Sequence, residues 1–100
     1  MDERVHHNHL TVNRGSQPAL SRHMKLHRDS VRERWVILAP ERILTPNQEA
    51  ADVLLLCDGA RTVAEIAATL AHQYDAEPDA IAADIIPLLQ GLADSGVIRP

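Results

Sequence analysis

The feature that most constrains the fold is a change of hydrophobic period at Thr45-Pro46. Before this point, residues 24–45 place their apolar side chains in short runs separated by turn residues. After it, apolar residues recur at spacings of three and four along most of the remaining chain. The first pattern is typical of short strands and the second of amphipathic helices. The chain therefore predicts a small sheet followed by helices.

Residues 24–45 predict a three-stranded antiparallel meander. Arg34–Leu38 is the strongest strand, because it combines β-branched and aromatic residues. Lys25–Arg28 is a weaker strand before it, and Arg42–Leu44 is a short strand after the Pro40-Glu41 turn. Since a helical pattern begins directly afterwards, the third strand is expected at the end of the sheet.

The central strand is apolar on both of its faces. Trp35 and Ile37 share one face and Val36 and Leu38 the other, because side chains alternate along a strand. We therefore expect both faces of the sheet to be at least partly covered.

The first of three predicted helices has a start and a stop signal. Thr45-Pro46-Asn47-Gln48 fits a capping box with proline at the first helical position, so the helix is expected to begin at Thr45 or Asn47. Asp58-Gly59 is expected to end it. Cys57 falls on the inner stripe and is therefore predicted to be a packed thiol rather than a nucleophile.

The second helix is predicted to begin at Thr62, which forms a capping box with Glu65, and the third begins near Glu77-Pro78. Pro87 lies inside the third helical pattern, where it removes a backbone donor and clashes with the carbonyl of Ala83. We therefore expect a kink there, or two shorter helices. The predicted inner stripes of the three helices are Ala50, Val53, Leu54 and Cys57; Val63, Ile66, Ala67, Leu70 and Tyr74; and Ile81, Ile85, Leu88, Leu89 and Leu92.

This order of elements predicts an α+β fold similar to a winged helix-turn-helix, with a three-stranded antiparallel sheet followed by a three-helix bundle. The domain is expected to span residues 21–100, with Val97-Ile98 returning to the core after the third helix. Residues 1–20 show no sustained period, so they are predicted to be a flexible arm. Three histidines lie in this arm, fewer than the four or so fixed ligands of a zinc site, so no metal site is predicted. They are His6, His7 and His9.

The formal charge of −4 is unevenly divided along the chain. Residues 1–45 carry eight Lys or Arg and five Asp or Glu, whereas residues 46–100 carry two and nine. No apolar run is long enough to span a bilayer, and the N-terminus has no signal-peptide pattern. Because the lone Cys57 cannot form an internal disulfide, we expect a reducing cytoplasm.

The same patterns bear on two other classes of function. A DNA-binding winged helix needs Lys or Arg on its recognition helix, and the chain has none between Arg61 and Arg99. An enzyme is not predicted, because the sequence shows no metal-ligand spacing, no Gly-rich phosphate loop and no nucleophile–base pair. No cofactor is implied. A DNA-binding or other protein-interaction module stays as the alternative.

Two stretches carry a family resemblance: WVILAPERILTPNQEAADVLLLCDGARTVAEIAATLAHQY and IAADIIPLLQGLADSGVI. Over about residues 18–98 the chain resembles PqqD, the peptide chaperone of pyrroloquinoline quinone (PQQ) biosynthesis. Pro87 and the His-bearing arm depart from the family pattern. The most specific parts are Trp35-Val36 through Ala39-Pro40-Glu41, Asn47 and Ala50, and Cys57-Asp58-Gly59 with Arg61-Thr62-Val63.

The resemblance implies a domain that does no chemistry itself. Proteins similar to PqqD bind the precursor peptide PqqA and present it to the radical SAM enzyme PqqE, which cross-links a Glu and a Tyr within it. In related recognition elements the peptide adds as a strand to the third strand and packs against the third helix. An exposed edge at residues 42–44 would then be the site, through main-chain hydrogen bonds.

The expected peptide-binding residues follow from that resemblance. For the three apolar helix residues among them a plain core position is an equal alternative, and Asp84 fits a solvated charge better than a contact. Arg42 would suit an acidic peptide. A homodimer through the open edge or the arm is left open. The residues are Arg42, Ile43, Leu44, Ile81, Asp84, Ile85 and Leu88.

Overall fold

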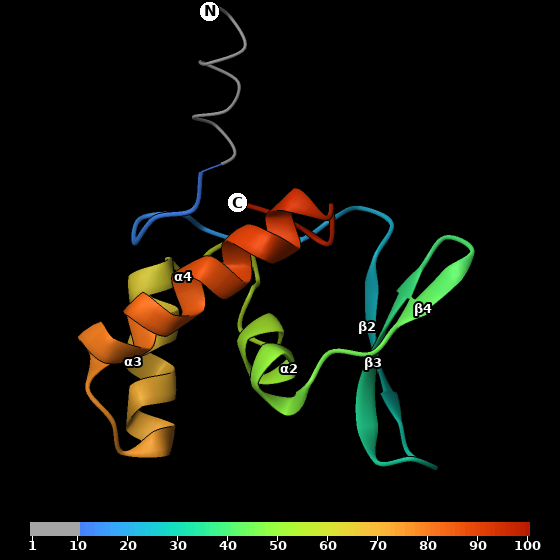
Figure 1. The fold of residues 1–100 in the computed structure, drawn as a ribbon, viewed down its shortest axis with the longest axis horizontal. Helices are drawn as coiled ribbons and strands as arrows, with labels where there is room; N and C mark the ends of the chain where they lie inside the picture. Colours follow the sequence, from blue (N-terminus) through green and yellow to red (C-terminus); the bar gives the residue numbers. More distant parts are fainter. Residues whose placement is uncertain (1–10) are drawn as a thin grey trace, which may run out of the picture.

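The computed structural model describes residues 11–100, which Figure 1 shows as a sheet at one end and helices at the other. Within these residues the larger sheet holds three antiparallel strands in the order β2-β3-β4. The predicted α+β, winged-helix-like fold is confirmed. The elements of the sheet and the helices are β2 (Lys25–Asp29), β3 (Arg34–Ala39), β4 (Arg42–Leu44), α2 (Gln48–Leu54), α3 (Val63–Tyr74) and α4 (Pro78–Asp94).

The register of the sheet places its largest buried residue at the centre of one face. Leu26 pairs with Ile37, and Ile37 pairs with Leu44, so the three side chains share the face that packs against the helices. Ile37 is only 2% exposed. Pro40 and Glu41 form the two-residue connection between β3 and β4, and Glu41 has a φ of 65°. A fixed proline φ followed by a positive φ fits a type II turn.

Of the two predicted starts of α2, Thr45 and Asn47, the structure has the second, without the capping box expected at Thr45. Asn47 is the N-cap, because its Oδ1 accepts a hydrogen bond from the backbone N–H of Ala50 at 2.8 Å. The helix also ends early, at Leu54, rather than at Asp58-Gly59. The residues after Leu54 form tight turns instead of continuing the helix, because the N–H of Cys57 donates to the carbonyl of Leu54, three residues earlier.

The start of α3 shows why residues 11–20 belong to the packed domain. The predicted capping box is present, because Thr62 and Glu65 exchange side-chain hydrogen bonds with each other's backbone N–H. The first two helical donors need partners outside the helix. Val63 N–H donates to the carbonyl of Ser16, and Ala64 N–H donates to that of Arg14.

Further contacts hold the same segment in place. Val12 is 4% exposed within the core, and its N–H donates to Gln90 of α4. Strand β1 (Ala19–Leu20) pairs with β5 (Ile98–Arg99), an antiparallel pair that the sequence analysis missed. Residues 11–20 were predicted to belong to a flexible arm, with the domain beginning at residue 21, but these contacts pack them against the domain. The three histidines of the predicted arm lie outside the described residues.

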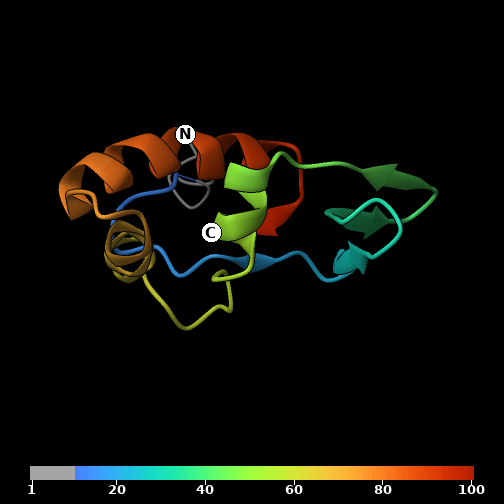
Figure 2. The ribbon, with the colours of Figure 1, turned by 90° about the horizontal axis from the view of Figure 1, so that it is seen from below.

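Helix α4 runs from Pro78 to Asp94 as one element, rather than as two shorter helices. It lies along the length of the helical part in Figure 2. Pro87 and Ala83 are both exposed, so water can reach the Ala83 carbonyl that loses its helical donor. An exposed proline is thus accommodated without ending the helix.

The core lies mainly between α3 and α4, with α2 and β3 closing one side. Aliphatic side chains fill it, in keeping with the scarcity of aromatics. Val97 and Ile98 return to this core as expected. Tyr74 is an exception to the predicted stripe of α3, because it remains 47% exposed at the end of the helix.

Candidate functional site

Strand β4 is an open edge of the sheet. Among the described residues it pairs only with β3. In an antiparallel hairpin with a two-residue turn, the closing pair is hydrogen-bonded and the next pair is not. Ala39 and Arg42 form the closing pair here, so the N–H and C=O of Ile43 point away from β3. The Ile43 side chain is also 64% exposed.

A hollow of about 310 Å³ lies beside this strand, between β4, the start of α2 and the end of α4. Leu44 and Leu92 contribute apolar surface from the strand and the helix. Arg42 contributes a positive charge. The lining residues are Ile37, Arg42, Leu44, Thr45, Pro46, Ala50, Leu92, Ser95 and Val97.

A narrower slot of about 70 Å³ lies farther along α4, where α2, α3 and α4 meet. Its apolar floor is bordered by the carboxylates of Glu49 and Asp84. At its edge the Tyr74 hydroxyl donates to Asp52, and this hydrogen bond raises the pKa of Tyr74 to about 12. The lining residues are Glu49, Val53, Leu70, Tyr74, Ile81, Asp84 and Ile85.

The expected site residues are divided between these two places. Arg42 and Leu44 line the hollow beside β4, and Ile43 lies on the open edge between them. Ile81, Asp84 and Ile85 line the slot instead. Leu88 is half-buried and packs against the core between the two.

Part of the hollow was not predicted from the sequence. Leu92 carried a signal, because it lies on the apolar stripe of the third helical pattern. Thr45 and Pro46 were interpreted only as helix-start residues, and Ser95 only as part of a stop signal. Their position beside β4 depends on how α4 packs across the sheet, which no local pattern specifies.

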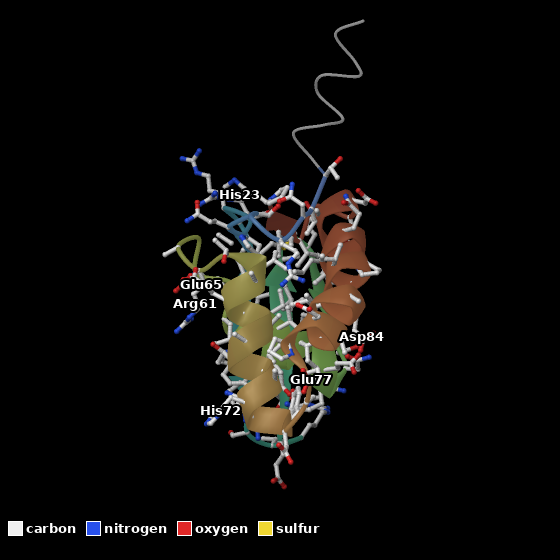
Figure 3. All side chains as sticks on the ribbon, turned by 90° about the vertical axis from the view of Figure 1, so that its left-hand side faces the viewer. His23, Arg61, Glu65, His72, Glu77 and Asp84 are labelled. Atoms are coloured by element: carbon white, nitrogen blue, oxygen red, sulfur yellow. The ribbon has the colours of Figure 1, made fainter. Side chains whose placement is uncertain are left out.

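The other candidate reactive groups do not form a catalytic arrangement in residues 11–100. Burial raises the pKa of the Cys57 thiol to about 12, and its Sγ donates to the Val53 carbonyl at 3.3 Å. His72 is exposed on α3, and Figure 3 shows it on the opposite flank of the helix pair from Asp84. Within the described part of the chain, no group of three acidic, His or Cys side chains is placed to hold a metal ion. No described helix is long and apolar enough to cross a membrane.

Fold and site together define a class: a small winged-helix-like domain with an open sheet edge beside a groove lined by its last helix. Residues 34–98 match the family model described as coenzyme PQQ synthesis protein D (PqqD). The chain belongs to the PqqD family.

Two kinds of relative match the chain: proteins of similar length that are named for the peptide PqqA, and a longer bifunctional protein. The chain is 53% identical to the "PqqA binding protein" of Rhodopseudomonas palustris strain HaA2 over 90% of this chain and 88% of the relative. It is 47% identical over 82 residues to the "Bifunctional coenzyme PQQ synthesis protein C/D" of Methylorubrum extorquens, covering 22% of that longer protein.

Two solved structures have similar folds. One is the solution structure of the PqqD truncation of Methylobacterium extorquens PqqCD, described as a functional, stand-alone recognition element for ribosomally synthesized and post-translationally modified peptides. It has a TM-score of 0.75 and 44% identity, covering 91% of this chain and 98% of that one. The other is the crystal structure of PqqD from Xanthomonas campestris, with a TM-score of 0.51 and 39% identity, covering 85% and 94%.

Proposed function

We propose that this protein is a peptide chaperone of PQQ biosynthesis, which binds PqqA by strand addition to β4 and presents it to the radical SAM enzyme PqqE. The observation that carries the proposal is the open edge at Ile43, whose two neighbours in β4, Arg42 and Leu44, line a hollow shared with α4. The names of the relatives support the peptide as the ligand.

Strand addition explains how such a small surface could bind a flexible peptide. Main-chain hydrogen bonds to Ile43 would supply affinity whatever the peptide sequence, and pockets for alternate side chains would supply specificity. Peptide side chains on the helix-facing side would enter the hollow between Leu44 and Leu92. An acidic side chain among them would lie near Arg42.

The groove would continue from the hollow to the slot along α4. Ala50 lines the hollow, whereas Glu49 and Val53 line the slot, so α2 contributes to both. Leu88 lies between the two on α4. The proposed peptide-binding residues remain Arg42, Ile43, Leu44, Ile81, Asp84, Ile85 and Leu88.

Binding and delivery, rather than catalysis, are the proposed mechanism. Holding the peptide lowers the entropy that it must lose when it meets the modifying enzyme. Helices α3 and α4 contain no Lys or Arg, which argues against the alternative of DNA binding. The cytoplasm is the proposed location, because the only cysteine of the chain, Cys57, is a buried free thiol.

Titration of synthetic PqqA by calorimetry tests the function and the site. We expect one-to-one binding, with a dissociation constant of about micromolar or below for an interface of this size. Ile43→Pro should abolish binding, because it removes an N–H that the β3–β4 pairing does not use. Ile43→Val is the matched control, because it keeps the backbone donor and a β-branched side chain.

The possible outcomes distinguish an error in the proposed function from an error in the proposed binding site. Circular dichroism must show that the proline variant is folded, and sedimentation must show whether the wild type is a homodimer through the same edge. Absence of binding by the wild type at high micromolar concentration would contradict the proposed function. Binding that survives in a folded proline variant would keep the function but place the peptide elsewhere.

A further inference from the structure

The outer face of the sheet is apolar at its centre, and no described helix covers it. Both faces were predicted to be at least partly covered, and here the cover is partial: Val36 is buried and Leu38 half-buried, but Figures 1 and 2 show the helices on the other side of the sheet. Strand pairing places Leu38 beside Ile43 and Val36 beside His27 on the opposite face from Ile37. A hollow of about 510 Å³ lies there, lined by His27, Asp29, Arg32, Arg34, Val36, Leu38, Ile43 and Thr45.

The apolar side chains of this hollow are accessible in part. Ile43 is largely exposed and Leu38 is half-buried, whereas Val36, at the floor between them, is only 5% exposed. Leu38 also borders a second hollow of about 390 Å³, so the surface continues beyond the first. Contiguous apolar surface with a polar rim is typical of a site that another protein covers.

The rim of the hollow is positively charged. Asp29 is the carboxylate of the lining, and it is shared by Arg32 at 3.4 Å and Arg34 at 3.8 Å. One carboxylate cannot neutralise two guanidinium groups. The second hollow adds Arg22 and Lys25 next to Leu38.

This charge distinguishes the sheet from the rest of the molecule. Residues 21–45 carry six Lys or Arg and three Asp or Glu, whereas residues 46–100 have a net charge of −7. A partner that meets the sheet would therefore need acidic residues around an apolar centre, because complementary charges steer and orient association.

We propose that the outer face of the sheet is a docking surface for an acidic protein surface with apolar residues at its centre. Resting on the proposed function, the inference assigns this surface to the radical enzyme that receives the peptide. The hollow proposed for peptide side chains is on the helix-facing side of β4, where Arg42 and Leu44 point. The docking surface is on the other side, where Leu38 and Ile43 point, so the two sites meet only along the edge strand. Peptide and enzyme can then be bound at the same time.

The chain contains a matched control for this surface. Asp29 Oδ1 accepts hydrogen bonds from the N–H groups two and three residues later, and Arg32 pairs with its Oδ2. Asp58 makes the same contacts, with Arg61 as the paired side chain at 3.3 Å. Arg61 lies between α2 and α3, away from the sheet, so the same substitution can be made in the same local structure at both places.

The test measures binding of the wild type and three variants to the purified radical SAM enzyme, and separately to synthetic PqqA. The variants are Arg32→Glu, Leu38→Gln and the control Arg61→Glu. We expect the first two to weaken enzyme binding by roughly tenfold or more, because they remove a complementary charge or the apolar centre. Arg61→Glu should bind the enzyme like the wild type, and all variants should keep the peptide affinity, which also shows that they are folded.

Three results would overturn the docking surface. Equal enzyme binding by all variants would place the enzyme elsewhere and leave the proposed function intact. A wild type that binds the peptide but not the enzyme would remove both this inference and the delivery step. Self-association of the wild type that Arg32→Glu abolishes, seen by sedimentation without enzyme, would assign the surface to a second copy.

Discussion

Tyr74 and Asp52 form a hydrogen-bonded pair at the rim of the slot, and it has a predictable pH dependence. The bond raises the pKa of Tyr74 to about 12, whereas an unfolded tyrosine titrates near pH 10. Because the folded-state pKa is the higher one, the bond stabilises the fold below about pH 10 and is lost as the pH rises through about 12.

Phenolate absorbance can test this pair directly, since Tyr74 is the only tyrosine in the chain. We expect the folded protein to titrate with a midpoint near 12, and Asp52→Ala to lower that midpoint toward the ordinary value. Asp75→Asn, a charge change on the next residue, should leave it in place. An unchanged midpoint in Asp52→Ala would show that another group is responsible.

Gly59 and Gly96 have nearly the same backbone angle but different surroundings. Their φ values are 80° and 82°, so a side chain is strained at either position. A Cβ on Gly59 would also lie 3.3 Å from the Cβ of Ala19, whereas a Cβ on Gly96 would meet nothing within 4 Å.

Alanine substitution at the two glycines should therefore have unequal effects. We expect Gly96→Ala to lower the free energy of unfolding by about 1 kcal/mol, from backbone strain alone. Gly59→Ala should lower it further, because the new methyl group also crowds Ala19 of β1, next to the hydrogen bond that the Gly59 N–H donates to the Pro18 carbonyl. Urea unfolding of both variants gives the comparison, and equal losses would show that β1 yields freely.

At the scale of elements, α4 lacks one backbone hydrogen bond because of Pro87, and a substitution can restore it. Pro87 is exposed and leaves the Ala83 carbonyl without its helical donor. Pro87→Ala should raise the free energy of unfolding by roughly 2 kcal/mol, because the restored bond outweighs the greater freedom of the unfolded chain.

Thermal unfolding with peptide titration would show whether Pro87 also shapes the groove. Ala83→Gly is a useful contrast, because it weakens the same turn without adding a donor. If Pro87→Ala were no more stable than the wild type, the backbone of α4 would already accommodate the proline ring without strain. Changed peptide affinity in the stabilised variant would implicate the course of α4 in binding.

For the whole molecule, residues 11–20 join the start of α3 to the end of the chain. Ser16 and Arg14 accept hydrogen bonds from the first donors of α3, and β1 pairs with β5. A chain that begins at Ser21 should therefore be less stable than one that begins at Thr11, by several kcal/mol on the basis of two lost backbone bonds, a lost strand pair and exposed core. Differential scanning calorimetry of both chains measures this, and equal melting temperatures would contradict it.

The two ends of the molecule also carry opposite charge, and this organises its proposed contacts. The sheet is basic and the helical part is acidic, with α3 and α4 lacking Lys and Arg. The proposed peptide groove lies where the two parts meet, at Arg42 and Leu92. The proposed docking surface lies wholly on the basic part.

Much of the local structure could be predicted from short-range patterns. The three strands of the sheet, the capping box of Thr62 and Glu65, and most of the buried stripes of the helices were confirmed. The start of α2 was predicted at Thr45 or Asn47, because both are good N-caps, and only the observed hydrogen bond of Asn47 distinguishes them. The peptide-binding residues stay a prediction, now distributed over a hollow and a slot.

By itself, the sequence determined the three strands of the larger sheet, the three helices after them, the charge division and the family, because these depend on residues that are close together in the chain. The tertiary structure alone decided three things: residues 11–20 are packed, Ile81 and Arg42 line separate hollows, and no described helix covers the outer face of the sheet. Each depends on contacts between distant residues, such as Ser16 with Val63 or Leu20 with Ile98. A hydrophobic period shows that a face is apolar, but only packing shows whether the chain covers that face or leaves it for a partner.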